Sequence, residues 1–159
     1  MNIPVTQKGD RMQISDKIFE QITYVEKRYA KFKQIFAIFV ESAQDLVGEN
    51  SPLKALKLEA SAEGNCLDVF FAGIHMRFLL LPCYGEGESA RGRVVCSRNI
   101  PTLYKDSDIL GSFTFSTDGS TDFDTAPGRD LIEMEYDATK IVLHFVHMAI
   151  NKPLPGLVA

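Results

Sequence analysis

The chain has 159 residues, 45% of them hydrophobic and 24% charged, and it carries a formal net charge of −4 at pH 7. This composition predicts one globular domain with enough apolar residues to form a core without disulfides or a structural metal. The acidic balance argues against general nucleic-acid binding and against adhesion to an anionic membrane surface. Residues 1–10 lack the apolar stretch of a signal peptide, and the three cysteines form no C-x-x-C pair, so we expect a cytoplasmic protein with reduced thiols and no membrane association.

The first predicted element is a long helix that follows a flexible N-terminal arm. We assign residues 1–14 to the arm and residues 15–159 to a single α+β domain. Ser15 is a typical N-cap, because its side chain can accept a hydrogen bond from a free amide of the first turn. Gly48 is a typical end of a helix. The helix is therefore expected to run from Ser15 to the residues just before Gly48.

Apolar residues of this helix follow a seven-residue repeat, which predicts packing along one continuous side. The repeat consists of Ile18, Ile22, Val25, Tyr29, Phe32, Phe36, Phe39, Ala43 and Leu46. From Ile35 to Val40 the helix is apolar on every side, and one sheet can cover only one of those sides. We therefore expect a homodimer whose self-association surface includes Ile35, Ile38, Phe39 and Val40.

Alternating apolar and polar residues then predict an antiparallel β-meander over residues 56–80. Gly73 and Ile74 are expected to form a two-residue type II′ turn, because Gly stands at the first central position. That turn places Val69 opposite Phe78. The apolar residues of all three strands then share one face of the sheet, and this agreement between neighbouring strands supports the meander.

Further strands and a second helix complete the predicted fold. The strands span residues 91–97, 110–117 and 131–136, and Asp137 is a typical N-cap for a helix over residues 138–151. Because this last segment is rich in β-branched residues, a strand is the alternative for it. The predicted fold class is α+β: a long N-terminal helix, an antiparallel β-meander of five to six strands, and a C-terminal helix packed on the sheet.

One face of the predicted sheet points away from the shared apolar set and combines apolar with basic side chains. Its candidate binding residues are Phe70, His75, Arg77, Leu79, Arg91 and Arg93. A face that only meets solvent would not usually carry Phe70 and Leu79. In one interpretation, the C-terminal helix covers the apolar part of this face. In the other, the face binds a protein partner or an anionic small ligand, with arginines at its edge.

Residues of chemically active types do not form a catalytic or metal motif. His144 and His147 would share one helix face, but no carboxylate follows at the spacing of a zinc site, so we expect one histidine to be partly buried and the other to face water. Cys83 is the thiol most expected to be exposed, whereas Cys66 and Cys96 are expected to be core residues. We predict no catalytic residue, no metal site and no cofactor.

Two polar loops resemble ligand sites only superficially. Residues 85–88 read Gly-Glu-Gly-Glu, which lacks the ending of a phosphate-binding loop, and the two glutamates would repel phosphate. Asp118, Asp122 and Asp124 do not follow the residue order of an EF-hand. We interpret both segments as solvated loops.

Three hypotheses for function follow from this pattern. The first is a non-catalytic protein-binding or regulatory domain (an inhibitor, an immunity-type protein or a chaperone) that acts as a homodimer. The second is a small-ligand sensor whose apolar pocket lies between sheet and helices and is lined by Phe70, Phe71, Phe78, Phe113 and Phe115. The third is an enzyme whose site is assembled by the fold from distant residues. We favour the first.

Overall fold

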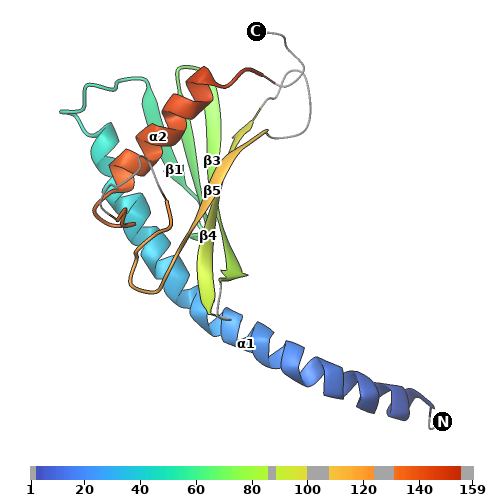
Figure 1. Cartoon of the computed structure of the whole chain (residues 1–159). Coiled ribbons are helices and arrows are strands. Elements are labelled where there is room, and N and C mark those ends of the chain that lie inside the picture. Colours follow the sequence, from blue (N-terminus) through green and yellow to red (C-terminus); the bar gives the residue numbers. More distant parts are fainter. Residues whose placement is uncertain (1–2, 86–88, 100–107, 124–130, 155–159) are drawn as a thin grey trace.

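The computed structural model describes residues 3–85, 89–99, 108–123 and 131–154, and it shows two helices, one short 3₁₀ segment and one antiparallel sheet (Figure 1). The helical elements are α1 (Ile3–Ala43), η1 (Gln44–Val47) and α2 (Ala138–Asn151). The strands are β1 (Leu56–Ala60), β2 (Cys66–Phe71), β3 (Ile74–Tyr84), β4 (Ala90–Asn99) and β5 (Asp108–Phe115). The predicted α+β fold class is confirmed, with five strands. No helix in the described ranges is both long and apolar enough to cross a bilayer.

Helix α1 begins earlier than the sequence predicts. It starts at Ile3 rather than after Ser15 and has 41 residues, which corresponds to about 60 Å. Pro4 lies in its first turn, where a missing amide proton breaks no helical hydrogen bond, so the proline allows the early start. The end agrees with the prediction: α1 stops at Ala43, η1 follows, and Gly48 has extended backbone angles.

The apolar seam of α1 meets the sheet only along the second half of the helix. The seam residues buried in the core are Phe32, Phe36, Phe39 and Ala43. In contrast, Ile18 is 49% exposed and Ile22 is 60% exposed. Figure 1 shows the blue N-terminal part of α1 running past the end of the sheet. We call residues 3–22 of α1 the overhang.

The strands pair in chain order, β1-β2-β3-β4-β5, and every neighbouring pair is antiparallel. The predicted turn between β2 and β3 is wrong: Ala72 and Gly73 form it, so Val69 pairs with Met76 rather than with Phe78. Both turn residues have positive φ (48° and 87°), as a type I′ turn requires. The resulting shift is an even number of residues, so the predicted apolar set keeps its face.

The C-terminal half of the fold differs from the prediction in one strand. β4 and β5 are confirmed, but residues 131–136 form only an isolated bridge between Glu133 and Ser120. A reason is visible in Asp137, whose carboxylate accepts the Glu133 amide (2.9 Å) and so stabilises a turn just before α2. The predicted helix over residues 138–151 is confirmed.

Both helices pack on the same face of the sheet, which we call the inner face. Aromatic rings connect the layers: Phe32 of α1 contacts Phe115 (ring centroids 5.7 Å apart), and Phe145 of α2 contacts Phe78 (5.5 Å). Phe113 also contacts Phe145 (6.4 Å). Three of the five aromatic side chains expected to line an apolar pocket, Phe78, Phe113 and Phe115, are therefore buried among other core rings.

Two of the four residues expected at a self-association surface lie instead in the core of the chain itself. Ile35 is 6% exposed and Phe39 is fully buried, while Val40 is half-buried and Ile38 is 40% exposed. Phe39 packs against Phe78 of the sheet, and α2 lies beside α1 on the same inner face. Self-association of the chain stays a prediction, but the buried residues are not its surface.

Candidate functional site

The opposite, outer face of the sheet is the candidate site. Strand register places all six predicted binding residues on it, in rows that run across β2, β3 and β4. These residues are Phe70, His75, Arg77, Leu79, Arg91 and Arg93. Because α1 and α2 both contact the inner face, no helix of the described ranges covers the outer one. The interpretation that the C-terminal helix covers its apolar part is therefore wrong.

The centre of the outer face is apolar. Leu79 pairs with Cys66 on one side and Val95 on the other, and Leu81 stands in the next outer row beside Arg93. Leu79 and Val95 are half-buried, and Leu81 is 40% exposed. An apolar centre of this kind, between two polar ends, is the arrangement found in protein–protein interfaces.

Asp68 organises the first polar end of the outer face. Its Oδ1 accepts a hydrogen bond from Arg77 Nε (2.9 Å), and its Oδ2 accepts one from Arg77 Nη2 (3.3 Å). Burial would raise the pKa of Asp68, but hydrogen bonds from Arg77 and His75 outweigh this effect and lower it. Asp68 and Arg77 also stand directly opposite each other on β2 and β3. The result is a charged carboxylate whose partners come from the chain itself.

His75 belongs to the same cluster and has both ring nitrogens engaged. Asn99 Nδ2 donates to His75 Nδ1 (3.3 Å), so the ring proton lies on Nε2, which donates to Asp68 Oδ1 (2.9 Å). The imidazole stacks on Phe70, with ring centroids 4.5 Å apart and an angle of 13° between planes. A general base needs a free nitrogen within reach of the substrate proton. His75 is therefore arranged as a structural side chain of the face.

The second polar end contains two arginines beside a hollow of about 570 Å³. Arg91 Nε donates to Thr114 Oγ1 (2.9 Å), and Thr114 in turn donates to Asp122 Oδ2 (2.9 Å). Arg93 is exposed and stands in the row between Leu81 and Thr114. This end of the face is thus the basic end, whereas the first end pairs its arginine with an aspartate.

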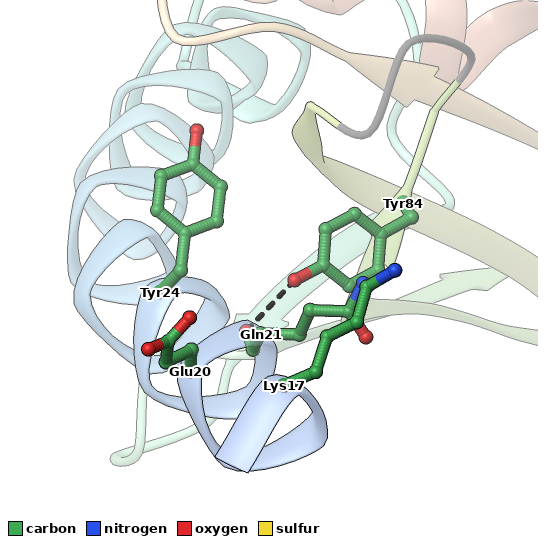
Figure 2. A pocket seen from close by; sticks show the side chains of 5 residues that line it. All are labelled: Lys17, Glu20, Gln21, Tyr24 and Tyr84. Atoms are coloured by element: carbon green, nitrogen blue, oxygen red, sulfur yellow. Dashed lines mark hydrogen bonds between the residues drawn. The ribbon is translucent and has the colours of Figure 1, made fainter. Parts of the chain in front are cut away.

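Another hollow, of about 310 Å³, lies where the overhang meets the end of β3 (Figure 2). Figure 2 shows the ring of Tyr84 reaching from the strand toward α1, where its hydroxyl donates to the backbone oxygen of Gln21 (2.8 Å). Lys17, Glu20 and Tyr24 complete the lining. The tyrosine ties the strand to the helix, so it helps to set the direction in which the overhang leaves the sheet.

The remaining histidines and cysteines do not assemble into a site. His144 is half-buried, and burial first and the neighbouring His147 second lower its pKa, while His147 is exposed. Among the described residues, no group of three or more His, Cys, Asp or Glu has metal-site geometry. Cys66 and Cys96 are buried, and burial raises the pKa of both thiols, which makes them poor nucleophiles. Cys83 is half-buried.

The polar loop after β5 is a hydrogen-bonded turn. The carboxylate of Asp118 accepts bonds from the Ser120 amide (2.9 Å) and from the Ser116 and Ser120 hydroxyls, and these bonds lower the pKa of Asp118 to about 2. Asp122 points its oxygens at Thr114 on β5 instead. Asp118 therefore stabilises the turn itself, and Asp122 attaches the loop to β5. Asp124 lies outside the described residues, as do residues 86–88 of the Gly-Glu-Gly-Glu loop.

Sequence reasoning missed several residues of the outer face. Asp68 and Thr114 alternate with core residues on their strands, so strand periodicity could have placed both on this face. Asn99 lay outside the predicted strand. Asp122 reaches the face where the chain reverses after β5; we expected a solvated loop there, but not its hydrogen bonds to Thr114.

Comparisons with protein-family models, with curated proteins and with solved structures find no match to this chain. The geometry described above is therefore the basis for a functional proposal.

Proposed function

We propose that the chain is a non-catalytic protein-binding domain with a regulatory role, and that its partner docks on the outer face of the sheet. One observation carries the proposal: both helices pack on the inner face, which leaves a β-sheet surface with an apolar centre and two polar ends without a cover in the described structure. Leu79, Leu81 and Val95 form that centre. Contiguous apolar patches of this kind mark binding surfaces in single-domain proteins.

Other features support binding over catalysis. The histidine of the outer face has both nitrogens engaged, and its aspartate is neutralised by an arginine. The space between sheet and helices, where a sensor would hold its ligand, is occupied by contacts between the rings of Phe78, Phe113 and Phe145. No geometric feature of the described residues favours an enzyme or a sensor over a binding domain.

The test is capture of a partner from the native host with a tagged chain, followed by mass spectrometry. We expect a stoichiometric protein partner, and we expect Leu81→Lys to lose it, because a lysine brings a desolvation cost into the apolar centre. Leu81 is 40% exposed, so the substitution should not disturb the core. Leu143→Lys is the matched control, because Leu143 is 38% exposed on α2, away from the outer face. Equal capture by both variants, or capture of no partner, would refute the proposal.

We further propose that the chain forms a homodimer through the overhang of α1. The seam residues Ile18 and Ile22 continue the buried side of α1 beyond the sheet, and Phe19 beside them is 68% exposed. Two copies related by a two-fold axis would bring identical seams together, as symmetric dimers do. Ile38, which was expected to take part, is on the other side of the helix and is not needed for this contact.

Light scattering at micromolar concentration tests the dimer. We expect the unchanged chain to show twice the monomer mass and Ile22→Glu to show the monomer mass, because a carboxylate would enter an apolar contact. Ile150→Glu is the control, since Ile150 is 53% exposed on α2 while Ile22 is 60% exposed. A monomer mass for the unchanged chain would contradict the dimer while leaving the outer face unaffected.

A further inference from the structure

The hollow at the basic end of the outer face holds two positive charges of one strand side by side. Arg91 and Arg93 are two residues apart on β4 and point to the same face, so their backbones are about 7 Å apart. Neither arginine has a carboxylate of the described residues within 4.0 Å. Two positive charges at this separation repel each other. A negative group between them would remove that repulsion.

One of the described residues that line the hollow is an acid, but its oxygens are engaged elsewhere. Asp122 Oδ1 accepts the Thr114 amide (2.7 Å), and Asp122 Oδ2 accepts the Thr114 hydroxyl (2.9 Å). The Asp122 amide also donates to the Thr114 backbone oxygen (3.0 Å). Asp122 is therefore fixed on β5 as a support for Thr114, and it does not bridge the two guanidinium groups.

The side chain of Arg91 is held in place from two sides. Its Nε donates to Thr114 Oγ1, which leaves both terminal nitrogens without a hydrogen-bond partner among the described residues. On the other side, a Cβ atom at Gly85 would lie 2.5 Å from Arg91 Cδ, so only a glycine leaves room for the arginine there. A guanidinium fixed through Nε keeps its two terminal nitrogens as an oriented pair of donors.

The charges of the hollow indicate what kind of anion it would take. Among the described residues that line the hollow, two guanidinium groups and one carboxylate leave a net single positive charge, which matches a group with one negative charge. A phosphate dianion would exceed this charge and would face the Asp122 carboxylate. A carboxylate is singly charged and planar, and its two oxygens can accept paired hydrogen bonds from one arginine.

We propose that this hollow is a carboxylate-binding site, in which Arg91 and Arg93 receive an aspartate or glutamate side chain of the protein partner. The inference rests on the proposed function, because it places the site beside the apolar centre on which the partner docks. Leu81 connects the two, since it is the cross-strand neighbour of Arg93. The partner surface would then present an apolar patch with an acidic residue at one edge.

The site itself is tested without the partner, with acetate as the probe. The Nε–H signals of Arg91 and Arg93 are followed by nitrogen-15 NMR in the whole chain. We expect acetate to shift both signals with a dissociation constant on the order of 10 mM. Acetamide, which has the same shape without the charge, should shift neither, and phosphate should bind more weakly than acetate. Shifts that are equal for acetate and acetamide, or tighter binding of phosphate, would overturn the assignment.

Variants locate the binding within the hollow. Arg93→Gln should weaken acetate binding about tenfold, because hydrogen bonds to charged groups are among the strongest in proteins. Arg93 is exposed, so the fold should be unaffected. Gly85→Ala should weaken binding as well, by displacing Arg91, while Arg28→Gln on the exposed side of α1 should change nothing. Unchanged acetate binding in Arg93→Gln would refute the site.

A further experiment tests whether the chain supplies the carboxylate from two acidic residues of its own. Glu86 and Glu88 follow Gly85 in the sequence, and the double variant Glu86→Gln, Glu88→Gln is titrated alongside the unchanged chain. Acetate binding by both chains supports a site for an external carboxylate. Binding by the double variant alone would mean that the chain supplies its own carboxylate, and would overturn the proposal.

The site and the proposed function can fail separately. If acetate binds but no protein partner is captured, the hollow binds carboxylates, but the carboxylate belongs to a free acid and not to a protein partner. If a partner is captured in a manner that depends on Leu81 but not on Arg93, the docking face stands and the carboxylate site falls.

Discussion

Gly92 lies on the inner face of β4, directly against the ring of Phe115. A Cβ atom at this position would be only 2.3 Å from Phe115 Cζ, and Phe115 is fully buried. We therefore expect Gly92→Ala to destabilise the fold by about 1–3 kcal/mol, the usual cost of overpacking a core. Urea unfolding measures this change. Ser97→Ala on the outer face of the same strand is the control, and equal effects of the two variants would show that the ring can move aside.

Arg98 is the buried cation of the described core, and it joins the sheet to the end of α2. Its Nη1 donates to the backbone oxygens of Ala149 and Lys152 (2.8 Å each), and its Nη2 donates to Pro153 O (3.1 Å) and Asp108 Oδ2 (2.7 Å). Its side chain is 6% exposed.

Removal of this arginine should be costly, because it leaves buried oxygens and a carboxylate without their donor. We expect Arg98→Leu to lower the free energy of unfolding by about 3–5 kcal/mol. Arg93→Gln, an exposed arginine of the same strand, should change it by less than about 0.5 kcal/mol. Chemical denaturation of both variants measures the difference. A loss below about 1 kcal/mol for Arg98→Leu would mean that water replaces the arginine.

The ion pair between Arg98 and Asp108 makes the stability of the fold depend on pH. Burial would raise the pKa of Asp108, but hydrogen bonds from Lys152 and Arg98 outweigh it and hold the pKa below its ordinary value. A lowered pKa in the folded state stabilises the fold above the unfolded value of about 3.9, and this contribution is lost as pH falls through the folded pKa.

We therefore expect the thermal midpoint of the unchanged chain to fall as the pH is lowered below about 4. Asp108→Asn should start lower and decline less steeply over the same range, because it has no proton to gain. Parallel pH profiles of the two chains, measured by circular dichroism, would show that Asp108 does not contribute.

At the scale of elements, the hairpin of β2 and β3 contains a backbone conformation that its residue does not favour. Ala72 has a φ of 48° and is the only residue other than glycine with positive φ in the described ranges. Asparagine tolerates this region, and Asn-Gly is the preferred pair for a type I′ turn. We expect Ala72→Asn to stabilise the fold by about 0.5–1 kcal/mol. Ala62→Asn in the turn between β1 and β2 is the control, and an equal gain there would contradict the explanation.

This hairpin also shows how far the sequence could predict the sheet. Alternation of apolar and polar residues placed Val69 and Leu79 on their correct faces, because the period of a strand is two residues. The turn was placed one residue too late, because a rule that assigns glycine to the first central position cannot anticipate Ala72 at positive φ. Pairing along β2 and β3 imposes that conformation.

The sequence predicts which site residues of a strand share a face, but it does not predict which loop residues reach that face. Arg91 and Arg93 alternate with the inner residues of β4, so their shared face follows from the sequence. Asp122 does not, because it reaches Thr114 through a chain reversal that includes a bridge between Phe115 and Thr121. Loop conformations depend on contacts between distant residues, which periodicity does not contain.

At the scale of the whole molecule, the hydrogen bond from Tyr84 to Gln21 ties the overhang to the two-layer body, and the N-terminal part of α1 runs past the end of the sheet. Residues 16–20 are all exposed, so this stretch of the helix adds little buried surface to the body. We expect a chain without residues 1–15 to keep its thermal midpoint within about 4 °C, which corresponds to roughly 1 kcal/mol. Because Ile18 and Ile22 remain, the shortened chain should also keep the dimer. A larger fall in the midpoint would show that the first residues of α1 contact the body.

The arrangement of layers was the part of the fold that the sequence could not specify. An amphipathic pattern shows that α2 buries one side, but it does not show which face of a sheet that side meets. The structure places α2 beside α1 on one face of the sheet, and Ile35 and Phe39 are buried in this layer without a second copy. The same placement leaves the outer face for a partner.

The packing of α2 on the sheet has a consequence for synthesis of the protein. Each strand pairs with its neighbour in the chain, so the hairpins can form as they leave the ribosome. The strands are made before α2, although α2 covers part of their inner face. During translation the rings of Phe78 and Phe113 therefore lack their contact with Phe145 until α2 emerges, which makes the nascent chain a substrate for chaperones that bind apolar segments. Chains arrested before residue 138 should accordingly associate with such chaperones, and full-length chains should be released.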